Sequence, residues 1–217
     1  TTKMKIHRIP QAIQTLIFVI DSTLYTGSAY AYEQVDCQVR EFAKLKNMTS
    51  DEARKLVFDF RKNFAKENNG KKISLGNLLT NFGIPIEQSV KWRNDLMRPE
   101  DFLVRDEKLI CELQILSKKY KLICVTNNPV KPARKTLEVI GISDFFEHIV
   151  GLDTCYKSKP AREPFEKALE LTKTAAENAV AIGDRYDLDI ELPLRMGMGG
   201  IEVSGVEDVY GLNVILG

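Results

Sequence analysis

The chain has 217 residues, 44% of them hydrophobic, so it is long enough to bury the core of one compact domain or of a domain with a modest insertion. Its 31 basic and 30 acidic residues leave a net charge of +1, which gives no reason to expect a surface that binds nucleic acid or membranes. The early apolar run at residues 16–20 is too short to span a bilayer or to act as a signal sequence, and we expect a cytoplasmic protein.

The first predicted element is a buried strand at residues 16–20, which runs into the polar turn Asp21-Ser22-Thr23. Residues 30–99 then show helical periodicity and no strand pattern. Within this block, Thr49 and Glu52 form a predicted capping box at the start of the second helix, and two shorter helical stretches follow. The sequence therefore predicts an all-helical block inserted after the first strand.

Strands and helices alternate in the second half of the chain. The predicted strands are residues 122–126, 146–150, 179–182 and 200–203, and the predicted helices are residues 106–119, 130–140, 163–171 and one ending near Gly197. Gly141 is expected to end the helix at 130–140. Repeated β-α-β units imply right-handed crossovers and an α/β fold with a doubly wound parallel sheet, whose ligand site lies at the carboxyl ends of the strands.

Four sequence blocks, each at a predicted strand end or before a helix, resemble the motifs of the haloacid dehalogenase-like (HAD) hydrolases in order and spacing. They are residues 19–25, similar to D-x-D-G-T-L, and residues 124–128, 159–165 and 182–190. The resemblance covers nearly the whole chain and implies a Rossmann-like core, residues 1–29 and 100–217, with a helical cap at residues 30–99. It is closest to the capped branch that includes pyrimidine 5′-nucleotidase-like phosphatases.

The resemblance also implies roles for particular side chains. In this family the first aspartate attacks phosphorus and binds Mg²⁺, and the second transfers a proton. Carried over by motif, Asp21 is the candidate acid/base, and the candidate Mg²⁺ ligands are Asp21, through its backbone carbonyl, Asp184 and Asp189. The candidate phosphate-binding residues are Thr126, Asn127 and Lys159.

Val19 occupies the place of the first aspartate when the block is aligned on Thr23-Leu24-Tyr25. Valine has no oxygen with which to attack phosphorus or to bind a hard cation. In an unrelated hydrolase, loss of the nucleophile lowers turnover by about 10⁶, roughly 8 kcal/mol of barrier. We therefore expect impaired or absent phosphatase catalysis, and Mg²⁺ binding that is weakened or lost. If Asp21 were the nucleophile instead, Tyr25 would stand where the family has threonine.

Each block has a simpler structural interpretation as well. Asp21 and its neighbours could form an ordinary turn or helix cap, and Thr126 could cap the following helix. Lys159 could be a solvated surface charge. Asp184, Asp187 and Asp189 resemble part of a calcium loop, but the glycine and the distal glutamate of that loop are absent from the sequence.

Three functions follow as alternatives. The first is a HAD-fold protein that recognises a small phosphorylated molecule or inorganic phosphate without cleaving it. The second is an active Mg²⁺-dependent phosphomonoesterase, nucleotidase-like or sugar-phosphatase-like, that uses a displaced nucleophile. The third is a regulatory or scaffold protein with a protein partner. The first is the interpretation we favour, because Val19 removes the attacking group.

Overall fold

The computed structural model describes residues 3–217, and these form two compact units. The core unit consists of residues 3–27 and 99–217, and the helical unit consists of residues 28–98. The chain therefore enters the helical unit after its first core segment and returns to the core unit at Pro99.

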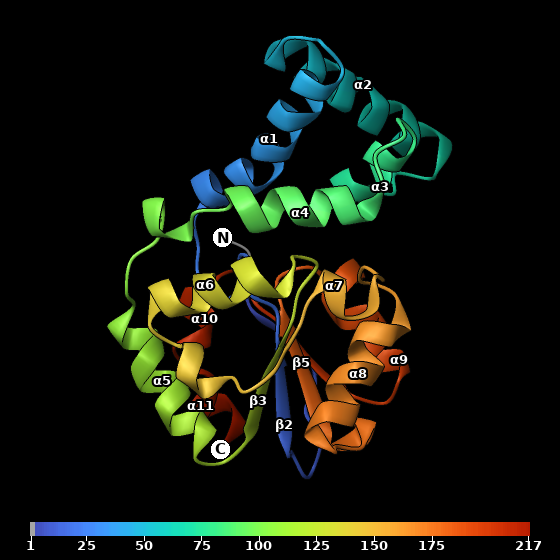
Figure 1. Ribbon diagram of the computed structural model, residues 1–217. Helices are drawn as coiled ribbons and strands as arrows, with labels where there is room; N and C mark the ends of the chain where they lie inside the picture. The colour runs from blue at the N-terminus through green and yellow to red at the C-terminus, as the bar shows by residue number, and fades with distance from the viewer. Residues whose placement is uncertain (1–2) are drawn as a thin grey trace. The chain divides into compact units, whose positions relative to one another are not determined.

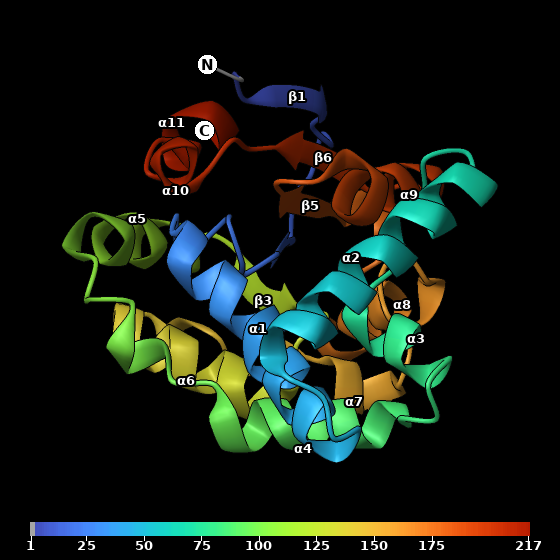
Figure 2. The same ribbon diagram turned by 90° about the horizontal axis from the view of Figure 1, so that it is seen from above.

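A single sheet forms the centre of the core unit (Figures 1 and 2). Within residues 3–217 it has six strands in the order β1-β6-β5-β2-β3-β4. Their bounds are β1 Lys5–Arg8, β2 Thr15–Phe18, β3 Lys121–Val125, β4 Ile149–Val150, β5 Ala179–Gly183 and β6 Gly199–Glu202. Every pair from β6 to β4 is parallel, with Ile17 of β2 facing Ile123 of β3 and Ala181 of β5. The predicted α/β fold with a mostly parallel sheet is confirmed.

The edge strand β1 was not predicted, and it pairs antiparallel with β6. All four of its side chains are exposed, so it carries no buried apolar pattern that the sequence could reveal. Strand β1 is thus an antiparallel edge strand on an otherwise parallel sheet. Backbone hydrogen bonding to β6 holds the strand in place, with an irregularity in register between Ile6 and Arg8.

Helices cover both faces of this sheet, as Figures 1 and 2 both show. One face carries α5 Glu107–Ser117, α6 Val130–Ile140, α10 Val206–Val209 and α11 Leu212–Leu216, and the other carries α8 Arg162–Thr172 and α9 Glu191–Arg195. The short helix α7 Leu152–Cys155 follows β4. Two covered faces explain why β2 and β5 are buried at every residue and read as continuous apolar runs.

Local sequence signals account for several element boundaries. Helix α6 ends at Gly141, whose φ of 94° lies in the left-handed region that favours glycine. On α8, Phe165 and Ala168 pack into a buried cluster with Ile17 and Ile123 of the sheet. The strand expected at residues 146–150 is shorter than predicted, because only its last two residues pair with β3.

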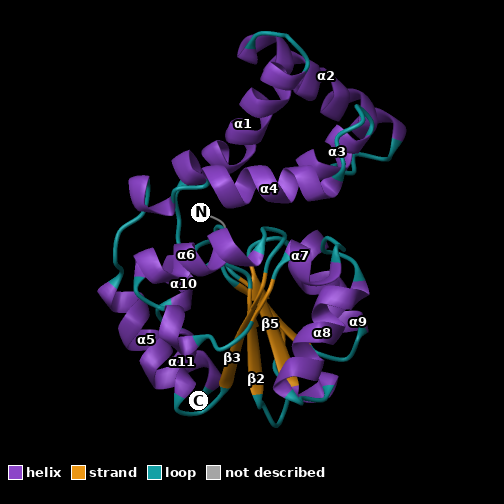
Figure 3. Cartoon of the chain, in the orientation of Figure 1, coloured by secondary structure: helices purple, strands orange, loops and turns teal. Residues whose placement is uncertain are grey.

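The helical unit contains α1 Ser28–Leu45, α2 Ser50–Glu67, α3 Leu75–Thr80 and α4 Ile86–Leu96, and Figure 3 shows helices and loops throughout residues 28–98. The predicted capping box is present: the Thr49 hydroxyl accepts from Glu52 N, and the Glu52 carboxylate accepts from Thr49 N. Phe42, Leu78 and Trp92 belong to the unit's own buried cluster. None of the helices within residues 3–217 is both long and apolar enough to cross a bilayer.

Candidate functional site

The candidate residues gather at one edge of the sheet, where three neighbouring parallel strands end. Val19 and Asp21 follow β2, Thr126 follows β3, and Asp184 follows β5. Lys159 lies in the loop before α8. It reaches this edge through an ion pair with Asp189, which lies in the turn after β5. The carboxyl ends of adjacent parallel strands are the usual place for a ligand site in an open α/β sheet.

Val19 extends β2 by one hydrogen bond, because its N–H donates to Ile182 O of the neighbouring strand at 2.9 Å. Its side chain is buried, with 8% exposed. The chain then turns sharply, and Ser22 takes a φ of 60°, which an L-residue adopts at some cost in strain. The position after this strand is therefore apolar and closely packed, and the first carboxylate available comes at Asp21.

The carboxylate of Asp21 is held on both of its oxygens. Oδ1 accepts a hydrogen bond of 2.5 Å from the hydroxyl of Tyr25, four residues further on. Oδ2 accepts one of 2.9 Å from Nδ2 of Asn128, which lies in the loop after β3. Asp21 thus joins the turn after β2 to the turn after β3.

Two of the expected phosphate-binding residues accept hydrogen bonds from backbone N–H groups. The Thr126 hydroxyl oxygen accepts from Asn128 N at 3.1 Å, which leaves the O–H hydrogen available for donation. The Asn127 side chain accepts from Lys159 N at 2.7 Å through Oδ1. Asn127 therefore positions the backbone of the loop that carries Lys159.

Lys159 and Asp189 form an ion pair that is almost completely enclosed. Lys159 Nζ lies 2.6 Å from Asp189 Oδ1, and the two side chains are 4% and 2% exposed. The other oxygen of Asp189 accepts from Arg185 N at 2.9 Å. Asp189 approaches the strand so closely that a Cβ on Gly183 would lie 2.5 Å from Asp189 Cβ, so only glycine fits there. A π-helical turn, Tyr186–Ile190, presents Asp189 in this position.

Asp184 is the first residue after β5, and its Oδ1 accepts from the buried Thr23 hydroxyl at 3.0 Å. Burial raises the pKa of Asp184, and the negative charge of Asp189 raises it further. The Thr23 hydrogen bond and the positive charge of Lys159 act in the opposite direction. Ionising Asp184 is therefore harder in the folded chain than in water.

Comparison with known proteins identifies the family of this fold and site. The family of haloacid dehalogenase-like hydrolases matches residues 16–203, which span strands β2 to β6 and all of the candidate residues. The chain belongs to this family. The predicted membership in the HAD hydrolases is confirmed, whereas the particular branch and the identity of Val19 as the replaced nucleophile stay predictions.

The relatives of this HAD chain include several phosphatases. It is 38% identical over 81 residues to phosphoglycolate phosphatase from Aquifex aeolicus, which is 37% of this chain and 38% of that protein. It is 26% identical over 181 residues to pyrophosphatase PpaX from Listeria welshimeri, which covers 82% and 77% of the two chains. It is 39% identical over 80 residues to glyceraldehyde 3-phosphate phosphatase from Pyrococcus abyssi, 36% of this chain and 33% of that protein. Two of these matches therefore span only about a third of the relative.

Solved structures show the same fold at lower identity. A HAD phosphatase from Thermococcus onnurineus superposes with a TM-score of 0.63 at 22% identity, covering 94% of this chain and 98% of that one. The HAD-hydrolase YfnB from Bacillus subtilis, described as bound to magnesium, gives a TM-score of 0.60 at 19% identity, covering 95% and 99%.

Magnesium is the metal that the family resemblance implies for this HAD chain, with Asp21, Asp184 and Asp189 as the expected ligands. A hard cation of this kind requires several oxygen ligands at close range. Both oxygens of Asp21 and both oxygens of Asp189 already accept hydrogen bonds. Within residues 3–217, no group of three His, Cys, Asp or Glu side chains is arranged to hold a metal ion. The expected ligand at Asp21 is its backbone carbonyl, which these side-chain contacts do not involve. Magnesium binding by Asp21, Asp184 and Asp189 stays a prediction, and no chemical step below depends on it.

Sequence reasoning did not assign a role to Tyr25 or Asn128, although both hold Asp21. Tyr25 lies four residues after Asp21, a spacing that a tight helical turn brings together. Asn128 follows the predicted phosphate-binding pair directly. Thr23, whose only use in the sequence was to align the first motif, is the hydroxyl partner of Asp184.

Proposed function

We propose that this HAD-family chain binds the phosphate group of a small molecule in its core unit and hydrolyses phosphate esters very slowly or not at all. The observation that carries the proposal is Val19, a buried apolar side chain at the end of β2, where the resemblance places the attacking aspartate. Without an oxygen at this position, a covalent aspartyl-phosphate cannot form there.

Asp21 is the nearest carboxylate that could take over as nucleophile, and its contacts argue against that role. Its two oxygens accept hydrogen bonds from Tyr25 and Asn128. Attack on phosphorus would require one of these oxygens to point its remaining lone pair toward the ester while both donors hold the carboxylate in its present orientation. A second change would then be needed, because Asp21 could no longer serve as the acid/base.

Recognition of phosphate is supported by the donors at the same edge of the sheet. Lys159 carries three N–H donors, and its pair with Asp189 uses one of them. Thr126 accepts a hydrogen bond through its oxygen and keeps its O–H for donation. Valine in place of an aspartate at position 19 also removes one negative charge that would repel a phosphate dianion.

Thermal unfolding in inorganic phosphate tests the binding part of the proposal. A ligand at about 100 times its dissociation constant stabilises the folded state by about 2.7 kcal/mol, so Tm is expected to rise with phosphate concentration. Sulfate at equal ionic strength controls for general salt effects. In the matched variant Thr126→Val, which keeps the shape and loses the hydroxyl, the rise should be smaller. An unchanged Tm in millimolar phosphate would contradict phosphate binding.

A single substitution tests the catalytic part. Val19→Asp is expected to raise hydrolysis of a panel of phosphate esters in the presence of magnesium, whereas Val19→Asn, of the same size but without a nucleophilic carboxylate, should not. The gain has a ceiling of about 10⁶, the factor by which loss of a nucleophile lowers turnover in another hydrolase. Trapping a covalent acyl-phosphate on the unsubstituted chain would overturn the proposal.

One other function has an observation in its favour, namely an active phosphatase with a displaced nucleophile. Its support is that the relatives carry phosphatase and pyrophosphatase names and that Asp21 lies two residues from Val19. It predicts steady hydrolysis by the unsubstituted chain that Asp21→Asn abolishes. Three predictions stay open under either function. They are that a cap at residues 30–99 selects the substrate, that the substrate preference is nucleotidase-like, and that magnesium binding is weakened.

A further inference from the structure

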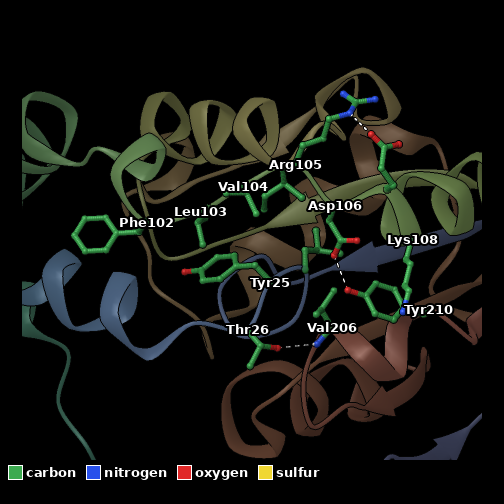
Figure 4. A pocket seen from close by; sticks show the side chains of 13 residues that line it. Tyr25, Thr26, Phe102, Leu103, Val104, Arg105, Asp106, Lys108, Val206 and Tyr210 are labelled. Atoms are coloured by element: carbon green, nitrogen blue, oxygen red, sulfur yellow. Dashed lines mark hydrogen bonds and ion pairs between the residues drawn. The ribbon is translucent and has the colours of Figure 1, made fainter.

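An open hollow of about 510 Å³ lies in the core unit, and its lining residues include Tyr25, Phe102 and Tyr210 (Figure 4). Several of its lining side chains, Leu24 and Tyr25 among them, expose at most 5% of their surface, so they offer a ligand little to contact. The helical unit carries a different feature, a surface whose side chains are exposed and mostly positive.

Five positive side chains follow one another on the second half of α2 and on the loop after it. They are Arg61, Lys62, Lys66, Lys71 and Lys72. Residues 61–72 contain a single acidic residue, Glu67, and all four lysines are exposed. Gly70 N donates to Ala65 O and Lys71 N donates to Asn68 O, so the loop turns back at the end of the helix and keeps its lysines beside the last turn. These five residues, with Phe58, are called the basic surface below.

The charges of the basic surface have no counter-charge, unlike charges elsewhere on the helical unit. On the same helix Lys55 Nζ lies 2.7 Å from a carboxylate oxygen of Asp59, four residues further on. On α4 Lys91 and Asp95 form a pair of 2.6 Å at the same spacing. None of the five cations has an ion pair within residues 3–217, and Lys62 and Lys66 place two like charges four residues apart. Like charges at this spacing destabilise a helix, so the arrangement is explained by a partner that supplies the negative charge.

Arg61 adds an enclosed donor to the basic surface. Its side chain is partly buried, and its Nε has no hydrogen-bond partner in the described part of the chain. Burial without an opposing charge lowers the pKa of Arg61. An enclosed guanidinium nitrogen without an acceptor costs free energy, and a carboxylate is a group whose two oxygens match the planar donors of arginine.

An exposed aromatic ring belongs to the same stretch of helix. Phe58 is 66% exposed, and it precedes Arg61 and Lys62 by three and four residues, the spacing that brings side chains together on a helix surface. Aromatic residues and arginine are enriched in protein interfaces. From Phe58 to Lys66 the helix rises about 12 Å, which is the length of about four extended residues.

We propose that the basic surface binds a short acidic segment of another protein, with an apolar side chain packed on Phe58 and carboxylates paired with the cations around it. Charge complementarity of this kind gives specificity and a fast association rate. Nucleic acid fits less well, because Asp59 and Glu67 flank the lysines of α2 and would repel a continuous phosphate backbone. Successive bases also need several exposed aromatic rings, and within residues 55–72 Phe58 is the only one. The proposal does not depend on phosphate binding by the core unit.

NMR titration of the isotope-labelled full chain tests this with three probes. They are a peptide with three glutamates on each side of a leucine, the same peptide with glutamine in place of glutamate, and a thymidine hexanucleotide. The acidic peptide is expected to give saturable shifts at the amides of residues 58–72, with an affinity that falls at least about tenfold between about 50 and about 500 mM NaCl. The glutamine peptide should bind at least about tenfold more weakly. Equal binding of the glutamine peptide, tighter binding of the hexanucleotide, or no saturable shifts at these amides would overturn the proposal.

Charge-matched variants separate the basic surface from positive charge in general. Lys62→Gln/Lys66→Gln is expected to weaken binding of the acidic peptide at least about fivefold, and Phe58→Ala about fivefold. Lys44→Gln/Lys46→Gln removes the same charge from two exposed lysines that precede α2, and it should change the affinity by less than about twofold. Equal losses in the two double variants would refute the site, and so would unchanged binding in Phe58→Ala. Thermal unfolding of the same variants in phosphate should match that of the unsubstituted chain, and it reports separately on the proposed function.

Discussion

Replacing Asp189 with asparagine is expected to destabilise the core unit, because it leaves the Lys159 ammonium enclosed without its counter-charge. The pair is nearly free of solvent, with side chains 4% and 2% exposed and 2.6 Å between Nζ and Oδ1. Asparagine keeps the shape of the side chain and can still accept from Arg185 N through its amide oxygen. The change therefore isolates the charge rather than the packing.

The expected magnitude follows from the burial. Removing one partner of a buried ion pair costs about 3–5 kcal/mol. Asp184 lies close enough for Lys159 to lower its pKa, and it provides partial compensation for the lost charge. We therefore expect the lower end, about 3 kcal/mol, which for a chain of this size corresponds to a fall in Tm of roughly 6–12 °C.

Urea unfolding followed by circular dichroism measures this loss. The double variant Lys159→Met/Asp189→Asn removes both charges and should recover most of the stability, since no enclosed ion is left unpaired. Glu170→Gln serves as the control, because its partner Lys167 and Glu170 itself are both substantially exposed, and such pairs contribute about 0–1 kcal/mol. A cost below about 1 kcal/mol for Asp189→Asn, or no recovery in the double variant, would refute the reasoning.

Hydrogen bonds from Arg54 and Arg40 lower the pKa of Asp36 to about 2 from an ordinary 3.8. Ionised Asp36 therefore adds about 2 kcal/mol to the free energy of unfolding above pH 4, and this contribution is lost as the pH falls toward 2. Comparing the acid unfolding of Asp36→Asn with that of the unsubstituted chain measures it. Thr49→Ala removes the hydroxyl that accepts from Glu52 N and should cost about 1 kcal/mol in urea unfolding. Because burial raises the pKa of Asp184, ionisation of this carboxyl group opposes folding at pH values above its ordinary pKa. Asp184→Asn should therefore raise Tm at pH 7, with the gain fading below about pH 4, and a lower Tm at pH 7 would contradict this.

The parts of the fold that the sequence predicted are those where burial leaves a pattern. Helix α6 carries an apolar face and a terminal glycine, and its predicted bounds, residues 130–140, match the structure. The strands β3 and β5 are short apolar runs between turn residues, and both were predicted within a residue or two. Parallel strands covered on both faces must bury every side chain, which is why they appear in the sequence as continuous apolar runs.

Other elements leave no such signal. The edge strand β1 is exposed along its whole length, and backbone pairing with β6 defines it. The π-helical turn Tyr186–Ile190 depends on how Asp189 packs against Gly183, which is a tertiary contact rather than a local propensity. Helices as short as α7 and α10 span a single turn, too little for helical periodicity to show.

The candidate site divides in the same way between local motif and tertiary contact. Motif spacing placed Asp21, Thr126 and Asp184 at strand ends, and the topology brings those strands together as neighbours. The partners of each carboxylate could not be read from spacing, because they come from residues up to 161 positions apart, as in the bond between Thr23 and Asp184. Which charges neutralise one another is therefore a property of the folded chain, and it decides how much each residue can do.

Val19→Asp is expected to change activity and stability in opposite directions. The new carboxylate would lie at a position that is 8% exposed. The N–H of residue 19 bonds to Ile182 O of β5, and Asp184 follows that strand directly. Lys159 is already engaged by Asp189, so burying a further charge here should cost at least about 2 kcal/mol at pH 7. Burial raises the pKa of such a group, so the deficit in Tm should shrink between pH 7 and pH 5. A variant that gained turnover with no loss of Tm at pH 7 would mean that the site already holds positive charge in excess, and the charge balance argued from the Lys159–Asp189 pair would be wrong.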